Sequence, residues 1–437
     1  MMQADQAHWS SRLPFYYGWL IVGIAFVTMA IGVTARTAFS LLMPPLIEEF
    51  RWDRGLAAGA FSFGFIVSAV LSPIVGRVID ARGPRIVILT GVAMMSAGLF
   101  LAPYIAQPWQ FYATLGVLVG GGANMMTYTV HSQFLPNWFV RRRALAISIA
   151  FAGAGVGGIV LLPWLQSIIL TQGWRASCTA IGFVVLLVIA PLSIFVRKRP
   201  QDIGLLPDGA AVQPESAGVR TMSNIVDSQW AATEWTLARA LQTMRFWWIV
   251  LAYFCGLVAW YAIQVHQTKY LTEIGFAPVV AAWALGAVSV IAIPGQILLG
   301  ALSDRIGREW VWTAGCAGFA ASYGALIAME HAPSNALLYV MVITQGFFGY
   351  ALTSVMGPIV AEIFEGPHYG AIFGTITVAL VSGGAAGPWI AGAIHDATGS
   401  YRSAFILIIG CCFVSAGAIW LAAPRKVRIV PGRMPRP

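Results

Sequence analysis

Long apolar runs separated by short polar stretches fill almost the whole chain. A helix needs about 20 predominantly apolar residues to cross a bilayer, and most of these runs reach that length without any Asp, Glu, Lys or Arg. The run at 86–140 is too long for one span, and Pro103 and Pro108 predict a turn inside it. We therefore expect twelve transmembrane helices, at 13–35 (with an apolar continuation to 47), 55–76, the two parts of 86–140, 144–174, 176–196, 246–268, 274–303, 310–329, 331–361, 366–395 and 403–424.

Composition supports an all-α membrane protein. Of the 437 residues, 58% are hydrophobic and 10% are charged, whereas a soluble domain has about 25% charged residues. This balance excludes a disordered chain, a nucleic-acid-binding module and an ordinary soluble enzyme. The five cysteines lie in apolar stretches without the spacing of metal ligands, so we expect no metal and no cofactor.

One long polar interruption divides the chain. We expect an N-terminal six-helix bundle at 1–196, a cytoplasmic linker at 197–245, a C-terminal six-helix bundle at 246–424 and a basic cytoplasmic tail at 425–437. With the N-terminus inside the cell, twenty of the twenty-six Lys and Arg residues fall on the cytoplasmic side, as the positive-inside rule requires. The net charge of +9 therefore indicates topology and not a nucleic-acid partner.

The two bundles are related by an internal repeat. Residues 76–85 recur as 300–308, an offset of 224 residues, and the glycine-rich stretch 153–158 recurs as 383–388. Residues 173–177 also recur as the Tyr-Arg segment that begins at Ser400. Such repeats predict two pseudo-symmetric halves that move against each other around a site near the bilayer midplane.

Both copies of the first repeat, with the pattern Gly-xxx-Asp and a following Gly and Arg, resemble the signature loops of the major facilitator superfamily. The segment 138–153 (WFVRRRALAISIAFAG) resembles the helix 4–5 signature of monocarboxylate transporters. The Tyr-Tyr-Gly-Trp sequence at 16–19 is similar to the helix 1 entry of that family and of its bacterial oxalate/formate relatives. The resemblance implies alternating access and transport of small carboxylates, commonly with a proton. Members often carry charged residues in helix 8, where 288–296 has none.

Arg36 is the sharpest chemical signal. It lies roughly 18 residues beyond Gly18, which is about 27 Å along a helix, and the resembling transporters carry a basic residue at this point of helix 1. Burying a guanidinium in the bilayer costs about 2.5–3.5 kcal/mol on insertion scales. This cost is tolerated where the group faces a wet cavity and binds an anion, and the planar guanidinium fits a carboxylate. Alternatively, the helix ends early and Arg36 reaches the outer interface.

Other candidate substrate ligands follow from position. Residues 260–266 of helix 7 correspond to Arg36 in the repeat, and helices 1 and 7 line the cavity in the resembling fold. His266 is the candidate proton carrier, although a lone His is often a structural hydrogen-bonding group. Polar residues at i, i+4 and i+7 of helix 4, ending at His131, predict one shared face. The candidates are therefore Trp260, Tyr261, Gln264 and His266 on helix 7, with Asn124 and Tyr128 on helix 4.

Charged residues at the loop ends predict a cytoplasmic gate. In the superfamily such clusters latch the state that is open to the outside. The expected members are Asp80, Arg82, Arg85, Asp304, Arg305, Arg308 and Glu362.

All seventeen acids map to loops, helix ends or tails, so this chain carries a buried cation and no buried acid mid-membrane. We therefore expect a bacterial inner-membrane transporter, acting as a monomer, for a small organic monocarboxylate. Co-transport of a proton removes the cost of moving an anion against the membrane potential, and anion exchange would do so as well. A multidrug exporter of the same fold, a receptor and a membrane-embedded enzyme are the alternatives.

Overall fold

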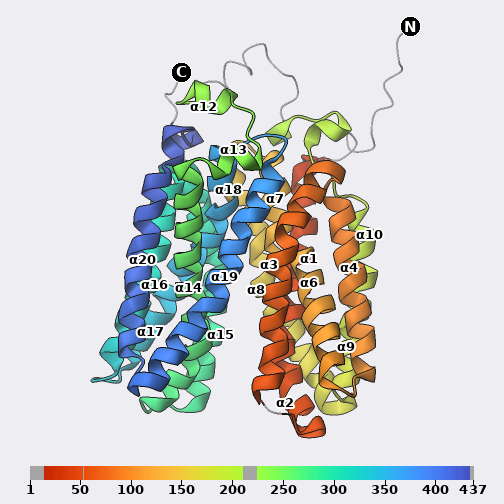
Figure 1. The fold of residues 1–437 in the computed structure, drawn as a ribbon, viewed down its shortest axis with the longest axis vertical. Helices are drawn as coiled ribbons and strands as arrows, with labels where there is room; N and C mark the ends of the chain where they lie inside the picture. The colour runs from red at the N-terminus through yellow and green to blue at the C-terminus, as the bar shows by residue number, and fades with distance from the viewer. Residues whose placement is uncertain (1–13, 53, 210–223, 434–437) are drawn as a thin grey trace.

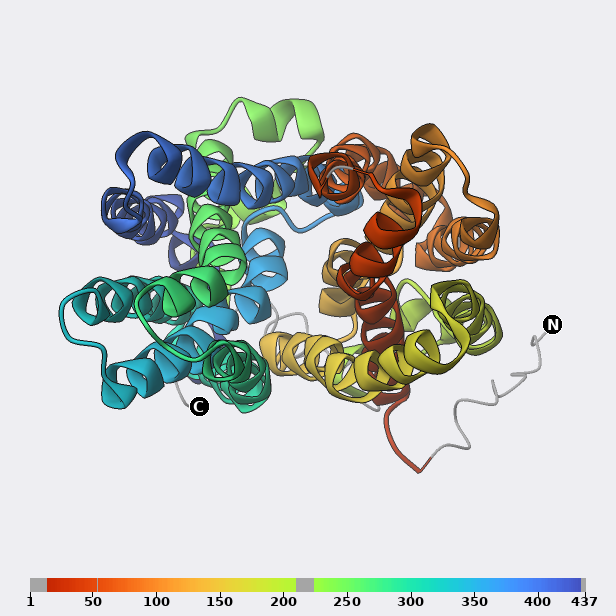
Figure 2. The same cartoon turned by 90° about the horizontal axis from the view of Figure 1, so that it is seen from below.

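The computed structural model describes residues 14–52, 54–209 and 224–433, which are almost entirely helical. Two helical halves lie side by side (Figure 1), and the view along the helices separates them clearly (Figure 2). The first half contains α1 (Tyr17–Thr37), α2 (Phe39–Phe50), α3 (Arg54–Arg82), α4 (Pro84–Leu101), α5 (Pro108–Phe111), η3 (Tyr112–Gly120), α6 (Gly121–Asn124), α7 (Tyr128–Phe134), α8 (Arg143–Gln172), α9 (Trp174–Val184), η5 (Val185–Ile189) and α10 (Ala190–Ser193). The second half contains α14 (Met244–Glu273), α15 (Pro278–Ile306), α16 (Arg308–Met329), α17 (Asn335–Ile343), η8 (Thr344–Phe348), η9 (Gly349–Ala351), α18 (Leu352–Ile363), α19 (Tyr369–Thr398) and α20 (Arg402–Ala422).

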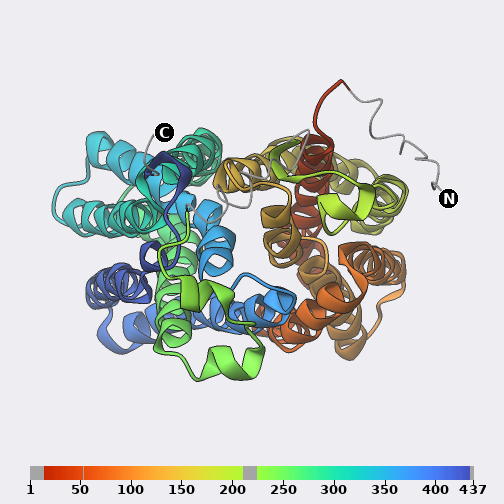
Figure 3. The ribbon, with the colours of Figure 1, turned by 90° about the horizontal axis from the view of Figure 1, so that it is seen from above.

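Short elements cover one end of both halves, which we call the linker end (Figure 3). The linker supplies α12 (Ser228–Ala232) and α13 (Leu237–Leu241), and the tail after α20 folds back beside it. The backbone of Val427 accepts hydrogen bonds from the amides of Val226 and Asp227, and the Ile429 amide donates to the Asn224 carbonyl. The tail and the linker are therefore joined by backbone pairing.

Within the described residues, eleven segments are long and apolar enough to cross a membrane. The turn predicted at Pro103 and Pro108 is confirmed, because α4 ends at Leu101 and α5 begins at Pro108. The helical stretch that follows is interrupted at 125–127, and it is not among the eleven.

This interruption corrects one expectation. Asn124, Tyr128 and His131 do not share one face of a continuous helix, because Thr127 has non-helical backbone angles (φ −118°, ψ −144°). The Thr127 carbonyl accepts hydrogen bonds from the amides of Val130 and His131. The His131 ring Nδ1 lies 2.9 Å from the Thr127 carbonyl oxygen and donates to it, since a carbonyl can only accept.

The repeated glycines bring helix backbones together within each half. In the first half α1 packs against α8, and in the second half α14 packs against α19. A Cβ atom at Gly153 or Gly157 would collide with the backbone of α1, and one at Gly383 or Gly387 would collide with that of α14. The two seams are equivalent under the repeat, so the duplication seen in the sequence is also present in the packing.

The halves meet through α3 with α19 and through α8 with α15. Near the linker end Gly76 on α3 leaves no room for a side chain against the backbone of Gly370 on α19. Away from the linker end the helices of the two halves diverge (Figure 1). The molecule is therefore closed at its linker end.

Candidate functional site

Arg36 lies in the last turn of α1, and its guanidinium carbon is 4.1 Å from the ring centre of Phe65 on α3. This is the distance of a cation–π contact. After Arg36, α1 ends at Thr37 and α2 begins at Phe39, within an apolar segment that runs from Tyr17 to Met43.

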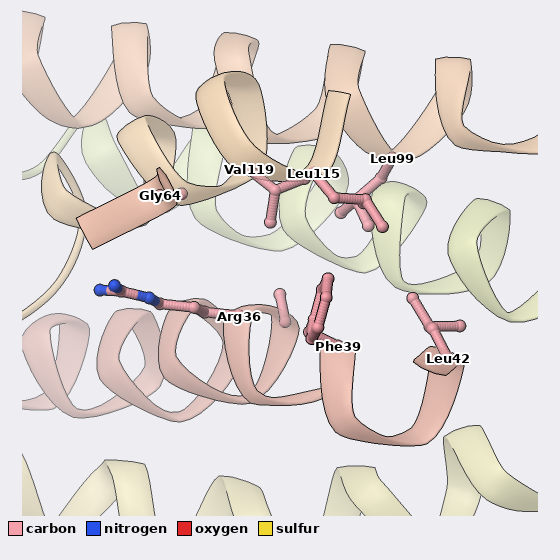
Figure 4. Close-up of a pocket in the computed structure, with 9 residues that line it drawn as sticks. Arg36, Phe39, Leu42, Gly64, Leu99, Leu115 and Val119 are labelled. Atoms are coloured by element: carbon pink, nitrogen blue, oxygen red, sulfur yellow. The ribbon is translucent and has the colours of Figure 1, made fainter. Parts of the chain in front are cut away.

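An apolar hollow borders the stem of Arg36 inside the first half (Figure 4). The guanidinium points away from the aliphatic residues of this hollow, past Gly64 (Figure 4). The hydrocarbon part of the side chain is thus packed against apolar groups while its charged end is directed elsewhere. The lining residues are Ala35, Arg36, Phe39, Leu42, Gly64, Leu99, Leu115, Val119 and Gly120.

The charged end is directed toward the opposite half. The Phe65 ring, which packs against the Arg36 guanidinium, also makes an edge-to-face contact with the ring of Tyr261 on α14. The ring centroids are 5.7 Å apart and the ring planes are at 86°. Among the titratable groups of the described residues, Tyr261 is the one with a resolved electrostatic effect on Arg36. Arg36 of the first half and Tyr261 of the second half therefore belong to one site between the halves.

Further aromatic residues extend this site. The rings of Trp260 and Tyr350 are 4.1 Å apart, and those of Tyr128 and Phe151 are 4.9 Å apart. Tyr128 interacts electrostatically with both Tyr261 and Tyr350, which joins the two pairs to the Arg36 group. We call this set the central aromatic cluster, and its members are Arg36, Phe65, Tyr128, Phe151, Trp260, Tyr261 and Tyr350.

The cluster offers hydrogen-bond donors. In the described part of the chain, the hydroxyl groups of Tyr128, Tyr261 and Tyr350 form no hydrogen bond with another residue, and all three side chains are half-buried. A tyrosine hydroxyl can both donate and accept a hydrogen bond. These three hydroxyls, together with one guanidinium, can therefore serve a bound anion.

Asn124, another predicted ligand, lies outside this cluster. Its amide nitrogen donates to the Ser68 carbonyl at 3.3 Å and to the Ser72 hydroxyl at 3.2 Å, and its oxygen accepts from the Thr129 hydroxyl at 3.0 Å. These bonds join α6 to α3 and to α7, and they use both the nitrogen and the oxygen of the amide. Asn124 therefore has a helix-packing role in this conformation.

His266 and Gln264 occupy the same helix as Tyr261. The His266 Nε2 lies 2.9 Å from the Pro388 carbonyl oxygen and donates to it, and its Nδ1 is 3.2 Å from the Tyr401 hydroxyl. His266 is five residues beyond Tyr261, which corresponds to a rotation of about 140° around the helix. The His266 ring therefore points away from Tyr261, toward α19 and the start of α20. Gln264, three residues from Tyr261 and half-buried, is on the neighbouring side.

Two acids link the halves reciprocally at the linker end. The Asp80 carboxylate accepts hydrogen bonds from the amides of Gly370 and Ala371 at the start of α19, at 3.0 and 2.8 Å. The Asp304 carboxylate accepts from the amides of Ala144 and Leu145 at the start of α8, at 3.4 and 3.2 Å. A negative charge at a helix N-terminus is stabilising, so each acid holds a helix of the other half.

The second half adds a buried ion-pair network. Arg308 is 1% exposed, and its guanidinium lies 2.6 Å from Asp304 and 2.8 Å from Glu362. The side chains of the other predicted gate residues are exposed and form no hydrogen bond or ion pair within the described residues, because they project from helix ends toward the surface. These residues are Arg82, Arg85 and Arg305.

Sequence reasoning missed two charged residues at this end. Lys198 donates to the Asp80 backbone carbonyl at 2.8 Å, and its Nζ is 4.0 Å from the Asp80 carboxylate. Glu365 lies 3.0 Å from Arg143 at the start of α8 and 3.0 Å from Arg428 in the tail. Neither residue belongs to the repeated motif from which the gate was predicted, so nothing in the sequence indicated that they take part in it.

The electrostatics of Glu365 follow from these two contacts. Desolvation raises the pKa of its carboxyl group, but Arg143 and Arg428 outweigh that effect and hold the pKa below its usual value. Glu365 is therefore held as a carboxylate between the first half and the tail. The Arg428 guanidinium also donates to the Glu362 carbonyl at 2.6 Å, which ties the tail to the buried network.

Comparisons with known proteins agree with this geometry. The sequence model described as Major Facilitator Superfamily matches residues 22–293 and 249–436. Monocarboxylate transporter 13 of Rattus norvegicus is 24% identical over 418 residues, which is 93% of this chain and 89% of that protein. An uncharacterised transporter of this superfamily, YcxA of Bacillus subtilis (strain 168), is 24% identical over 294 residues and 67% of each chain.

A solved structure shares the fold. The proton:xylose symporter XylE superposes with a TM-score of 0.73 at 14% identity, over 93% of this chain and 95% of that chain. At this identity the likeness concerns the fold alone. The expectation of a major facilitator fold is confirmed, and the relatives are transporters and not enzymes.

Proposed function

Because the chain belongs to the major facilitator superfamily of membrane transporters, we propose that it carries a small organic monocarboxylate by alternating access. In this proposal Arg36 binds the carboxylate, and the hydroxyl of Tyr261 donates to it from the opposite half. The observation that carries the proposal is the Arg36–Phe65–Tyr261 contact, which connects the guanidinium on α1 to a tyrosine of the opposite half. A ligand held by both halves can couple its binding to their relative motion.

The linker end supplies the gate in this proposal. The bonds of Asp80 and Asp304 to helix starts of the opposite half hold that end closed while substrate enters from the other side. We infer that the linker end is cytoplasmic and that the membrane is the bacterial inner membrane. The excess of basic residues on that side supports this orientation.

Purified protein in liposomes tests the carboxylate site. We expect Arg36→Gln to weaken carboxylate uptake and the thermal stabilisation by carboxylates at least about ten-fold, because charge-assisted hydrogen bonds are lost. Arg77→Gln is the matched control, since Arg77 is an exposed arginine on α3. Equal ligand stabilisation in Arg36→Gln and wild type would remove Arg36 from the site.

The energetic coupling needs its own experiment. Moving an anion into a negative-inside compartment costs about 2.3 kcal/mol per 100 mV, which either a co-transported proton or a counter-moving anion removes. We propose symport with His266 as the proton carrier. His266→Gln should then abolish uptake driven by a pH gradient and leave exchange against internal carboxylate intact. Wild-type uptake that ignores the pH gradient but accelerates with internal carboxylate would establish the exchanger instead.

A further inference from the structure

The aromatic rings of the central aromatic cluster come from both halves. Phe65, Tyr128 and Phe151 belong to the first half, while Trp260, Tyr261 and Tyr350 belong to the second. The Phe65–Tyr261 and Tyr128–Phe151 pairs are near perpendicular, at 86° and 80°. Edge-to-face contacts of this kind are one of the two arrangements that aromatic rings prefer.

The cluster contains one charge. Its other titratable members are tyrosines, and the resolved electrostatic effects on them come from Arg36 and from one another. A ligand with one carboxylate is therefore matched by Arg36. A second carboxylate would lie among rings and hydroxyls without a cation, and burying an unpaired charge is costly.

The guanidinium already has an aromatic partner. The Phe65 ring covers one side of Arg36 at 4.1 Å, and its edge contact reaches Tyr261. A flat unsaturated ring bound at the carboxylate can make the same edge and face contacts with Phe65, Tyr261 and Trp260. A saturated ring of similar size lacks the quadrupole that gives these contacts their geometry.

This inference rests on the proposed function. We propose that the transported molecule is an aromatic monocarboxylate. Its carboxylate binds Arg36, and its flat ring lies between Phe65 of the first half and the Trp260–Tyr350 pair of the second half. The hydroxyls of Tyr128 and Tyr350 take an oxygen substituent on the ring or on its side chain. Substrate specificity then comes from ring contacts, and Arg36 supplies affinity for the charge.

The test compares three probes on wild-type protein in liposomes and in thermal-shift titrations. Phenylacetate and cyclohexylacetate differ in aromaticity at nearly equal size, and phenylmalonate adds a second carboxylate. We expect phenylacetate to bind about five-fold more tightly than cyclohexylacetate and phenylmalonate to bind more weakly than either. Equal or tighter binding of cyclohexylacetate or phenylmalonate would overturn the inference but leave carboxylate transport in place. Failure of all three probes, with acetate and lactate bound, would overturn it as well.

Two variants separate this inference from the proposed function. Phe65→Leu should reduce the ratio of phenylacetate affinity to cyclohexylacetate affinity to below about two-fold. Trp389→Leu is the control, because Trp389 is 73% exposed on α19, and it should keep the wild-type preference. Loss of every carboxylate in wild type would defeat the proposed function itself. A Phe65→Leu protein that keeps the full preference would defeat only the aromatic assignment.

Discussion

Asp80 and Asp304 occupy equivalent repeat positions, and each accepts two backbone hydrogen bonds from the half to which it does not belong. Each half therefore provides one acidic side chain that caps a helix of the other half. Four hydrogen bonds and two helix N-termini are therefore involved in this reciprocal link between the halves at the linker end. Opening that end requires both acids to lose these partners.

Hydrogen exchange can resolve the reciprocity. Asp80→Asn should speed amide exchange at 370–371 roughly five- to ten-fold, because a capping interaction is weakened, and should affect 144–145 less. Asp304→Asn should show the opposite pattern. If both variants changed exchange equally at both helix starts, the idea that each acid caps a different helix would be wrong.

Arg308 should be the most sensitive charged residue of the gate. Arg308→Met leaves the carboxylates of Asp304 and Glu362 buried without a cation, and breaking a buried ion pair typically costs about 3–5 kcal/mol. We expect a large drop in the thermal unfolding temperature. Arg305→Met, a neighbouring exposed arginine, should change stability by no more than about 0.5 kcal/mol. Similar losses in the two variants would show that the network contributes little.

The Glu365 contacts should depend on pH. The pKa of this carboxyl is lower in the folded protein than its ordinary value, so its stabilising contribution is present above the ordinary value and is lost as the pH falls through the folded one. The protection factors of the tail amides at 427–429, which correct for the pH dependence of intrinsic amide exchange, should therefore fall in wild type on acidification from about pH 6 to about pH 3, below the ordinary value near 4.3. Glu365→Gln should show low protection factors throughout. A wild-type profile that parallels the variant would exclude this role.

Two adjacent glycines provide a packing test. Gly157→Ala would drive a methyl group into the backbone of Ala30, whereas the nearest atom to a Cβ at Gly158 is a Leu162 methyl at 4.0 Å. Overpacking costs about 1–3 kcal/mol, so Gly157→Ala should lower the unfolding temperature and the yield of folded protein. Gly158→Ala should be neutral or stabilising, since alanine is favoured in helices. Equal effects would mean that the α1–α8 seam can relax.

The features that the sequence predicted are those that depend on local or repeated signals. Charge-free runs predicted the spans because hydrocarbon excludes charge, and the turn before Pro108 follows from proline chemistry. Arg36 could be singled out from the sequence because a lone charge in an apolar run is conspicuous. Phe65 could not, because an aromatic residue in such a run is indistinguishable from any lipid-facing or core residue.

The features that were missed depend on tertiary contacts. The interruption at 125–127 redirects Asn124, Tyr128 and His131 to three different partners, and nothing in the spacing of these residues indicates it. The contacts of Lys198 and Glu365 bring residues of the linker, the tail and both halves together, so they exist only after the bundle has assembled.

The glycine seams have a mechanical consequence. Gly153 and Gly157 lie against the backbone of α1, and Gly383 and Gly387 lie against that of α14. At these contacts no flexible side chain lies between the two helices, so a tilt of one helix relative to the other would make their backbones collide. We therefore expect each helix pair to move as a rigid body when the halves change their relative orientation.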